Sequence, residues 1–139
     1  EIGKAQMFWV EPAGTSPDVT LIACGSLVHN ALLAARELES EGIKVRLINN
    51  VSVKPMDVET IITGAKDAGA VVTIEEHQVA GGMGSAVAEI LAKNCPVPIE
   101  FIGVQNSFGQ SGEPNELVEY FGMGVSHIIE AAKKVIQRK

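Results

Sequence analysis

The segment from residue 71 to residue 91, VVTIEEHQVAGGMGSAVAEIL, constrains the fold of this chain more than any other. It opens with the apolar, β-branched run 71–74, which is typical of a buried strand. Three ionisable residues end the run, and a glycine-rich turn then leads into a helix-like segment that starts at Ser85. In open α/β sheets, ligand sites and partner surfaces tend to lie where strands end in this way. We therefore expect any functional surface to include this turn.

The rest of the chain alternates between strand-like and helix-like segments. The run 18–24, DVTLIAC, is almost continuously apolar, as expected for a parallel strand covered on both faces. Further strands are expected at 43–48, 71–74 and 99–104, with a possible short strand at 7–10. Apolar residues at helical spacing predict helices over 27–41, 58–68, 85–93, 114–121 and 127–139. This alternation predicts an α/β fold, a three-layer sandwich around a mainly parallel sheet of about five strands.

Several predicted helices are flanked by residue types that stabilise helix ends. Ser26, Asp57 and Ser126 each precede a helix and are expected N-caps. Gly42 and Gly69 each follow a helix and fit the left-handed position found there. These residues set the expected boundaries of three helices.

Chain length and composition suit one compact domain over residues 1–139, with residues 1–17 as an N-terminal arm. Trp9 is the single tryptophan, and we expect it to pack this arm against the sheet; a partner interface is the alternative. Aromatic residues make up only 4% of the chain, so the core must be built from aliphatic side chains.

Charge and hydropathy argue against several kinds of partner. The net charge of −6 disfavours binding to nucleic acid or to a membrane surface, because such binders usually present a basic face. No apolar run approaches the roughly 20 residues that cross a bilayer. Cys24 and Cys95 lack metal-ligand spacing, which favours a reducing cytoplasm and no disulfide. The chain starts at Glu1 without a signal peptide, so we expect a fragment of a longer polypeptide.

Glu75, Glu76 and His77 form a polar cluster at the end of the strand. Two carboxylates beside an imidazole could act as acid and base. Adjacent strand residues point to opposite faces, however, so Glu75 and His77 share one face and Glu76 points the other way. We therefore favour a strand-end salt bridge or a contact between subunits over catalysis.

The glycine turn, with Gly81, Gly82, Gly84 and Ser85, is a second candidate site. It does not fit a dinucleotide fingerprint, because Val87 occupies the third glycine position and the turn does not follow the first strand. The free N–H groups of the helix start could still attract an anion. Alternatively, the glycines serve only to allow a tight passage from strand to helix.

No catalytic residue and no metal ligand is expected in this chain. His29 and His127 have no partner at metal-binding spacing, and Cys24 ends a buried strand, where a thiol is usually inert. The chain contains no nucleophile elbow, Walker loop, His-Glu-x-x-His or EF-hand pattern. These residues alone predict a fold without a convincing active site.

Several segments, taken in order, resemble the C-terminal domain of transketolases. They are DVTLIACGS at 18–26, AAREL at 34–38 with EGIKV at 41–45, KPMD at 54–57, VTIEEH at 72–77 with GGMGSAV at 81–87, and FGQSG at 108–112 with the helix that ends at Phe121 and Gly122. Each motif is modest alone, but the ordered set covers nearly the whole chain and is fairly specific.

The resemblance implies a thiamine-diphosphate enzyme that moves two-carbon ketol units between sugar phosphates, as in the pentose phosphate pathway. In that family the cofactor and its divalent metal (Mg²⁺) are bound by two other domains, and this chain contains neither the Gly-Asp-Gly metal motif nor a matching pyrimidine-site glutamate. The resemblance therefore implies a non-catalytic dimerisation and scaffold domain that binds no cofactor alone. Its expected partners are the thiamine-binding domains or subunit of the same enzyme, in a cytoplasmic homodimer.

Three alternatives remain open on the sequence. The same domain type closes 1-deoxyxylulose-5-phosphate synthase and the beta subunit of 2-oxoacid dehydrogenases. His77 and the FGQSG loop favour transketolase over both. The third alternative is of another class, a free-standing module that senses an anion or nucleotide at residues 81–85.

Overall fold

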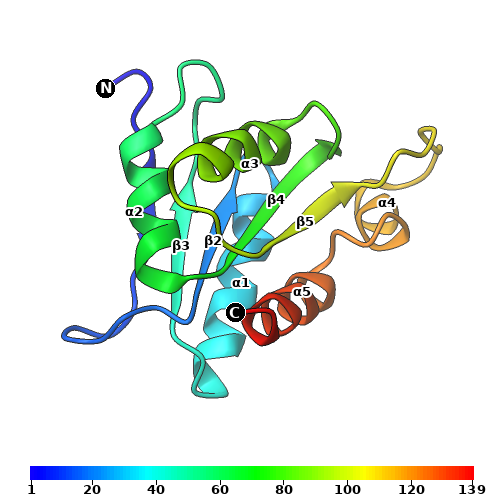
Figure 1. The fold of residues 1–139 in the computed structure, drawn as a ribbon. Coiled ribbons are helices and arrows are strands. Elements are labelled where there is room, and N and C mark those ends of the chain that lie inside the picture. Colours follow the sequence, from blue (N-terminus) through cyan, green and yellow to red (C-terminus); the bar gives the residue numbers. More distant parts are fainter.

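The computed structural model describes all 139 residues and has one five-stranded sheet with helices on both faces (Figure 1). The strand order is β1-β3-β2-β4-β5. Strand β1 runs antiparallel to β3, and all other neighbours are parallel. The strands are β1 Gln6–Trp9, β2 Val19–Ala23, β3 Val45–Asn49, β4 Val71–Gln78 and β5 Ile99–Val104. The helices are α1 Leu27–Ser40, α2 Val58–Ala68, α3 Met83–Asn94, α4 Pro114–Tyr120 and α5 Val125–Gln137. The predicted α/β sandwich with a mainly parallel sheet is confirmed.

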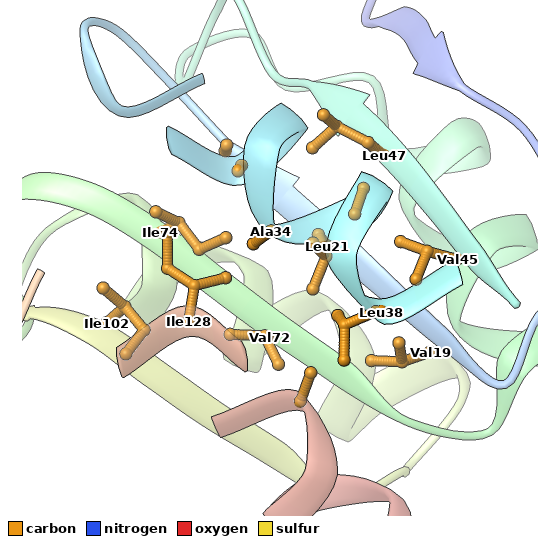
Figure 2. Close-up of a cluster of buried hydrophobic side chains, with 14 of the residues drawn as sticks. Val19, Leu21, Ala34, Leu38, Val45, Leu47, Val72, Ile74, Ile102 and Ile128 are labelled. Atoms are coloured by element: carbon orange, nitrogen blue, oxygen red, sulfur yellow. The ribbon is translucent and has the colours of Figure 1, made fainter. Parts of the chain in front are cut away.

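Helices α1 and α5 cover one face of the sheet, and α2 and α3 cover the other (Figure 1). The strands divide their side chains between these faces because successive residues point to opposite sides. In β2, Leu21 joins the larger hydrophobic cluster beneath α1 and α5, whereas Ile22 joins the smaller cluster beneath α2 and α3. Figure 2 shows the larger cluster, where Leu21 and Val72 of the sheet lie close to Leu38 of α1. The core is aliphatic, as the composition predicts.

The expected helix caps are confirmed at Asp57, Gly42 and Gly69, Ser26 holds the predicted N-cap position without a side-chain capping bond, and the prediction for Ser126 is wrong. Asp57 caps α2 by accepting the Thr60 N–H at 3.3 Å, and Gly42 and Gly69 have left-handed φ angles of 85° and 71°. Ser126 lies inside α5, which begins one residue earlier, after Gly124.

Ser26 precedes α1 as predicted, but its hydroxyl makes no capping bond. It donates instead to a carboxylate oxygen of Glu76. A charged acceptor forms a stronger hydrogen bond than a neutral one, and this acceptor comes from a strand 50 residues further along the chain. The position of Ser26 before the helix therefore did not determine the hydrogen-bond partner of its hydroxyl.

Strand β1 contains an irregularity that separates two of its side chains. In a regular strand, Met7 and Trp9 would point to the same face. The register of β1 on β3 shifts between these residues. As a result, Trp9 packs against the larger cluster on the α1 side, while Met7 lines a hollow beside α2. The expectation that Trp9 anchors the N-terminal arm to the sheet is confirmed.

Candidate functional site

The carboxylate of Glu75 lies inside the turn that joins β4 to α3. Strand β4 continues four residues beyond Ile74, where the sequence predicted its end, and so carries Glu75 under the first turn of the helix. One oxygen accepts the Met83 N–H at 2.8 Å and the other accepts the Gly84 N–H at 2.6 Å. The Glu75 side chain is almost fully buried. It satisfies two N–H groups that a helix start leaves unpaired and places a negative charge at the positive end of the helix dipole.

Two glycines of the turn are required by this close approach. A Cβ atom at Gly82 would collide with the Glu75 carboxylate and stand 2.5 Å from the Gln78 carbonyl oxygen. A Cβ atom at Gly84 would stand 2.9 Å from Glu75 Oε2 and 2.7 Å from Thr73 Oγ1. These glycines therefore serve the passage from strand to helix and also make room for the carboxylate.

Gly81 and Ser85 close the same turn. Gly81 has a left-handed φ of 82°, and its N–H donates to Ser85 Oγ at 2.9 Å. The Ser85 hydroxyl donates in turn to the Val79 carbonyl at 2.8 Å. The hydroxyl thus ties the start of α3 back to the end of the strand.

Glu76 and His77 diverge from each other, as strand alternation predicts. Glu76 is exposed and accepts a hydrogen bond from Ser26. His77 shares a side of the strand with Glu75, and its Nδ1 lies 4.0 Å from Glu75 Oε1. That nitrogen is closer to the Gln78 carbonyl oxygen, at 2.8 Å. The two side chains are close, but their distance is beyond direct proton transfer, because the carboxylate is held by the backbone of α3.

A hollow of about 300 Å³ opens beside this turn, lined by Cys24, Val53, Glu75, His77, Gly81, Gly82 and Met83. Burial of Cys24, together with the nearby Glu75 carboxylate, raises the pKa of its thiol. Cys24 is therefore a protonated and weakly nucleophilic thiol at neutral pH.

A second hollow of about 380 Å³ is lined by Gln78, Asn106, Ser107 and Phe108. Gln78 Nε2 donates to the Ser107 carbonyl at 2.7 Å, which ties the loop after β5 to the end of β4.

Two exposed apolar residues at this end of the sheet were missed as site residues. Phe108 is 99% exposed, and Val53 on the loop after β3 is 45% exposed. For Phe108, the signal in the sequence was a large apolar side chain within a loop of glycine and polar residues. We call Val53, Glu76, His77 and Phe108 the strand-end surface.

The structure groups no three His, Cys, Asp or Glu side chains in an arrangement that could hold a metal ion. Among its helices, none combines the length and the apolar character that crossing a membrane requires.

Comparison with known proteins identifies the family. The family described as "Transketolase, C-terminal domain" matches residues 10–128. The chain is 47% identical over 122 residues to the 6-deoxy-6-sulfo-D-fructose transketolase subunit SqwH of Clostridium sp. (strain MSTE9), covering 88% of this chain and 38% of that protein. It is 39% identical over 119 residues to 1-deoxy-D-xylulose-5-phosphate synthase of Heliobacterium modesticaldum (strain ATCC 51547 / Ice1), covering 85% of this chain and 18% of that protein.

A solved structure shows the same fold. It is described as "Split gene transketolase, inactive beta4 tetramer" and superposes with a TM-score of 0.90 at 39% identity, covering 99% of this chain and 43% of that one. The chain thus spans less than half the length of each of these relatives. The match of fold, of ordered motifs and of sequence across most of the chain shows that it belongs to the transketolase C-terminal domain family.

Proposed function

We propose that this chain is the non-catalytic pairing domain of a thiamine-diphosphate-dependent transketolase that acts as a cytoplasmic homodimer. The full enzyme would transfer two-carbon ketol units between sugar phosphates, as in the pentose phosphate pathway. One observation carries the proposal: both oxygens of Glu75, the buried carboxylate at the strand ends, are bonded to the backbone of α3. The conspicuous acidic group is therefore a structural cap.

The residues of this chain do not fit thiamine diphosphate and its metal. A diphosphate needs free N–H donors or cations, and a divalent metal needs several oxygen ligands in one place. The N–H groups of Met83 and Gly84 are already occupied by Glu75, and exposed Glu76 would repel a second anion. The cofactor would be held by the remainder of the enzyme.

The strand-end surface is the proposed site of subunit pairing, in the region of Glu75 to Gly84. Phe108 projects fully into solvent beside a hollow, and burying a phenylalanine side chain contributes about 2 kcal/mol. Interfaces are enriched in aromatic anchors that sit next to pockets of this kind. Phe108 of one subunit would enter the corresponding surface of its partner.

Size-exclusion chromatography with light scattering tests this role, on the chain alone and mixed with a thiamine-binding part of the enzyme. We expect self-association that Phe108→Ala weakens at least about tenfold, since a tenfold change corresponds to about 1.4 kcal/mol. Leu33→Ala is the matched control, because Leu33 is also exposed but lies on α1. A strict monomer in both preparations would exclude the pairing role.

Two other functions are separated by direct assays. The 39% identical synthase keeps the 1-deoxyxylulose-5-phosphate synthase family as an alternative host enzyme, which an activity assay of the assembled enzyme distinguishes. For a free-standing sensor, calorimetry with sugar phosphates and nucleotides is decisive. We expect no binding, because Glu75 already fills the helix start; tight binding by this chain alone would favour the sensor.

A further inference from the structure

We propose that the hollow beside the turn from β4 to α3 is a binding site for a small organic cation, whose alkylammonium or guanidinium group is held by the Glu75 carboxylate. This hollow, here called the Glu75 hollow, has a volume of about 300 Å³, at the lower end of the range for ligand pockets. All the residues that line it belong to one chain, so a ligand can bind without subunit pairing. A ligand at this position is not part of the proposed function.

One oxygen of the Glu75 carboxylate borders the hollow. Oε1 accepts the Met83 N–H at 2.8 Å and lies 4.0 Å from His77 Nδ1, and both Met83 and His77 line the hollow. A Cβ atom at Gly82, a third lining residue, would collide with this same oxygen. Oε2 instead accepts the N–H of Gly84, which does not line the hollow. A ligand would therefore approach the carboxylate at Oε1.

Oε1 can accept a further hydrogen bond. A carboxylate oxygen offers two lone pairs, and Oε1 uses one of them for the Met83 N–H. Among the ion pairs of the molecule, Glu75 has a single possible partner, His77. His77 Nδ1 lies closer to the Gln78 carbonyl oxygen, at 2.8 Å, than to Oε1. A cationic ligand would supply the missing charged donor, and hydrogen bonds to charged groups are roughly twice as strong as neutral ones.

The negative charge of Glu75 acts across the hollow. Burial is the main cause of the raised pKa of the Cys24 thiol, and the Glu75 charge raises that pKa further. Both of these side chains line the hollow, whereas no lysine or arginine lines it. Charges interact more strongly in such a site than in open water, because the local dielectric constant is lower. The Glu75 hollow therefore attracts cations and repels anions such as sugar phosphates and nucleotides.

The remaining walls of the hollow suit a short hydrocarbon chain. Val53 and Met83 contribute apolar side chains to the lining. Methionine is flexible and polarisable, so it adapts to ligands of irregular shape. Gly81 and Gly82 contribute no side chain, which leaves room beside Oε1. A ligand with a cationic head and a short apolar tail would therefore satisfy the carboxylate and the walls together.

An NMR titration of the isotope-labelled 139-residue chain with n-butylammonium chloride tests the site. Two probes of the same length, neutral n-butanol and anionic n-butyrate, are compared with it at equal ionic strength. We expect butylammonium to shift the amide signals of Gly81, Gly82 and Met83, with an affinity at least about tenfold higher than that of butanol. Butyrate should shift none of these signals.

Two variants that raise the net charge equally locate the cation. His77→Lys places an ammonium group at the rim of the hollow and should weaken butylammonium binding at least about tenfold, because it competes for Oε1. The His77 side chain is 65% exposed, so this change leaves the core intact. Glu76→Gln is the matched control, because Glu76 is exposed and does not line the hollow. Glu75→Gln should remove the preference for butylammonium over butanol, and circular dichroism verifies that each variant is folded.

Three results would overturn the inference. They are equal affinities for butylammonium and butanol, unchanged butylammonium affinity in His77→Lys, and shifts of the same amide signals when the chain is diluted without any probe. The last result would show that a side chain of a second copy fills the hollow. The pairing role is tested separately by light scattering. A failed titration therefore leaves the pairing role intact, and a strict monomer that binds butylammonium contradicts only the pairing.

Discussion

Glu75 Oε2 accepts the N–H of Gly84 at 2.6 Å, and this contact joins the end of β4 to the first turn of α3. The carboxylate fits because neither Gly82 nor Gly84 has a side chain, and the helix start is satisfied because Glu75 is buried beneath it. The two residues are nine positions apart in the sequence, and each is needed for the contact that the other makes.

Gly84→Ala should destabilise the protein by about 1–3 kcal/mol, as overpacking of a tight site typically does. The added Cβ would stand 2.7 Å from Thr73 Oγ1 and 3.0 Å from Phe101 Cδ1. Alanine is more favourable than glycine in a helix by about 1 kcal/mol. We expect the cost of crowding to be larger than this gain. Urea unfolding measures the difference. Gly109→Ala is the control, since nothing lies within 4 Å of its Cβ position; equal stability of both variants would refute the crowding.

Glu75→Ala should lower the free energy of unfolding by about 1–3 kcal/mol, because two buried N–H groups lose a charged acceptor. Formate or acetate should restore part of this stability in a concentration-dependent manner, by occupying the vacated position as a small carboxylate. Thermal unfolding with formate, and with chloride at equal ionic strength, checks this. Glu76→Ala is the control, because Glu76 is exposed. Identical effects of formate on both variants would contradict a specific rescue.

The ion pair between Glu11 and Arg46 should make stability depend on acid pH. Burial by itself would raise the pKa of the Glu11 carboxyl, but the hydrogen bonds and charge of Arg46 outweigh burial and hold the pKa below its usual value. A lowered folded-state pKa adds stability above the unfolded value of about 4.3, and this stability is lost as pH falls through the folded value.

Unfolding by urea at a series of pH values between about 7 and 3 tests this dependence. Wild type should lose stability below about pH 4.3, and Glu11→Gln should lose less over the same interval. The pKa of Asp57 is also lowered. Its burial would raise the pKa, but hydrogen bonds from Ala5 and Thr60 and the charge of Lys4 outweigh the burial. Asp57 therefore adds acid sensitivity equally to wild type and to the variant. Parallel pH profiles for wild type and variant would show that Glu11 contributes nothing to the acid sensitivity.

Cys24 should react slowly with iodoacetamide near neutral pH. Burial and the Glu75 carboxylate raise the pKa of its thiol, so little thiolate is present. Glu75→Gln removes the negative charge and should shift the rate profile of Cys24 alkylation to lower pH. Mass spectrometry of the Cys24 peptide across a pH series measures both profiles, with glutathione as the reference thiol. A shift to higher pH in the variant would contradict the electrostatic explanation.

Periodicity and local capping predicted most of the elements. The apolar run of β2 and the β-branched start of β4 identified buried parallel strands, because a strand covered on both faces must be apolar on both. The cap of α2 was predictable because Asp57 and Thr60 are three residues apart, and a contact that short depends on local sequence alone. The candidate residues Glu75 to Ser85 lie around one turn because they are neighbours in the sequence, and their role as an interface or anion site stays a prediction.

Contacts between distant segments could not be predicted in this way. The sequence placed Ser26 as a cap, but the tertiary structure gave its hydroxyl to Glu76 on a neighbouring strand. The sequence offered an open helix start as an anion site, but the extra length of β4 carried Glu75 into it. Whether a hydroxyl or a helix-start N–H group is free to bind a ligand depends on which side chain lies nearest to it in space.

By itself, the sequence determined the α/β alternation, the aliphatic core and the family, because these follow from local pattern and ordered motifs. Only the tertiary structure decided the strand order, which places β1 and β5 at the two edges of the sheet and lets Arg138 and Gln105 donate to backbone carbonyls of β5. It also decided that the irregularity after Met7 turns Trp9 inward and leaves Phe8 exposed. These outcomes depend on hydrogen bonding and packing between segments that local sequence does not pair.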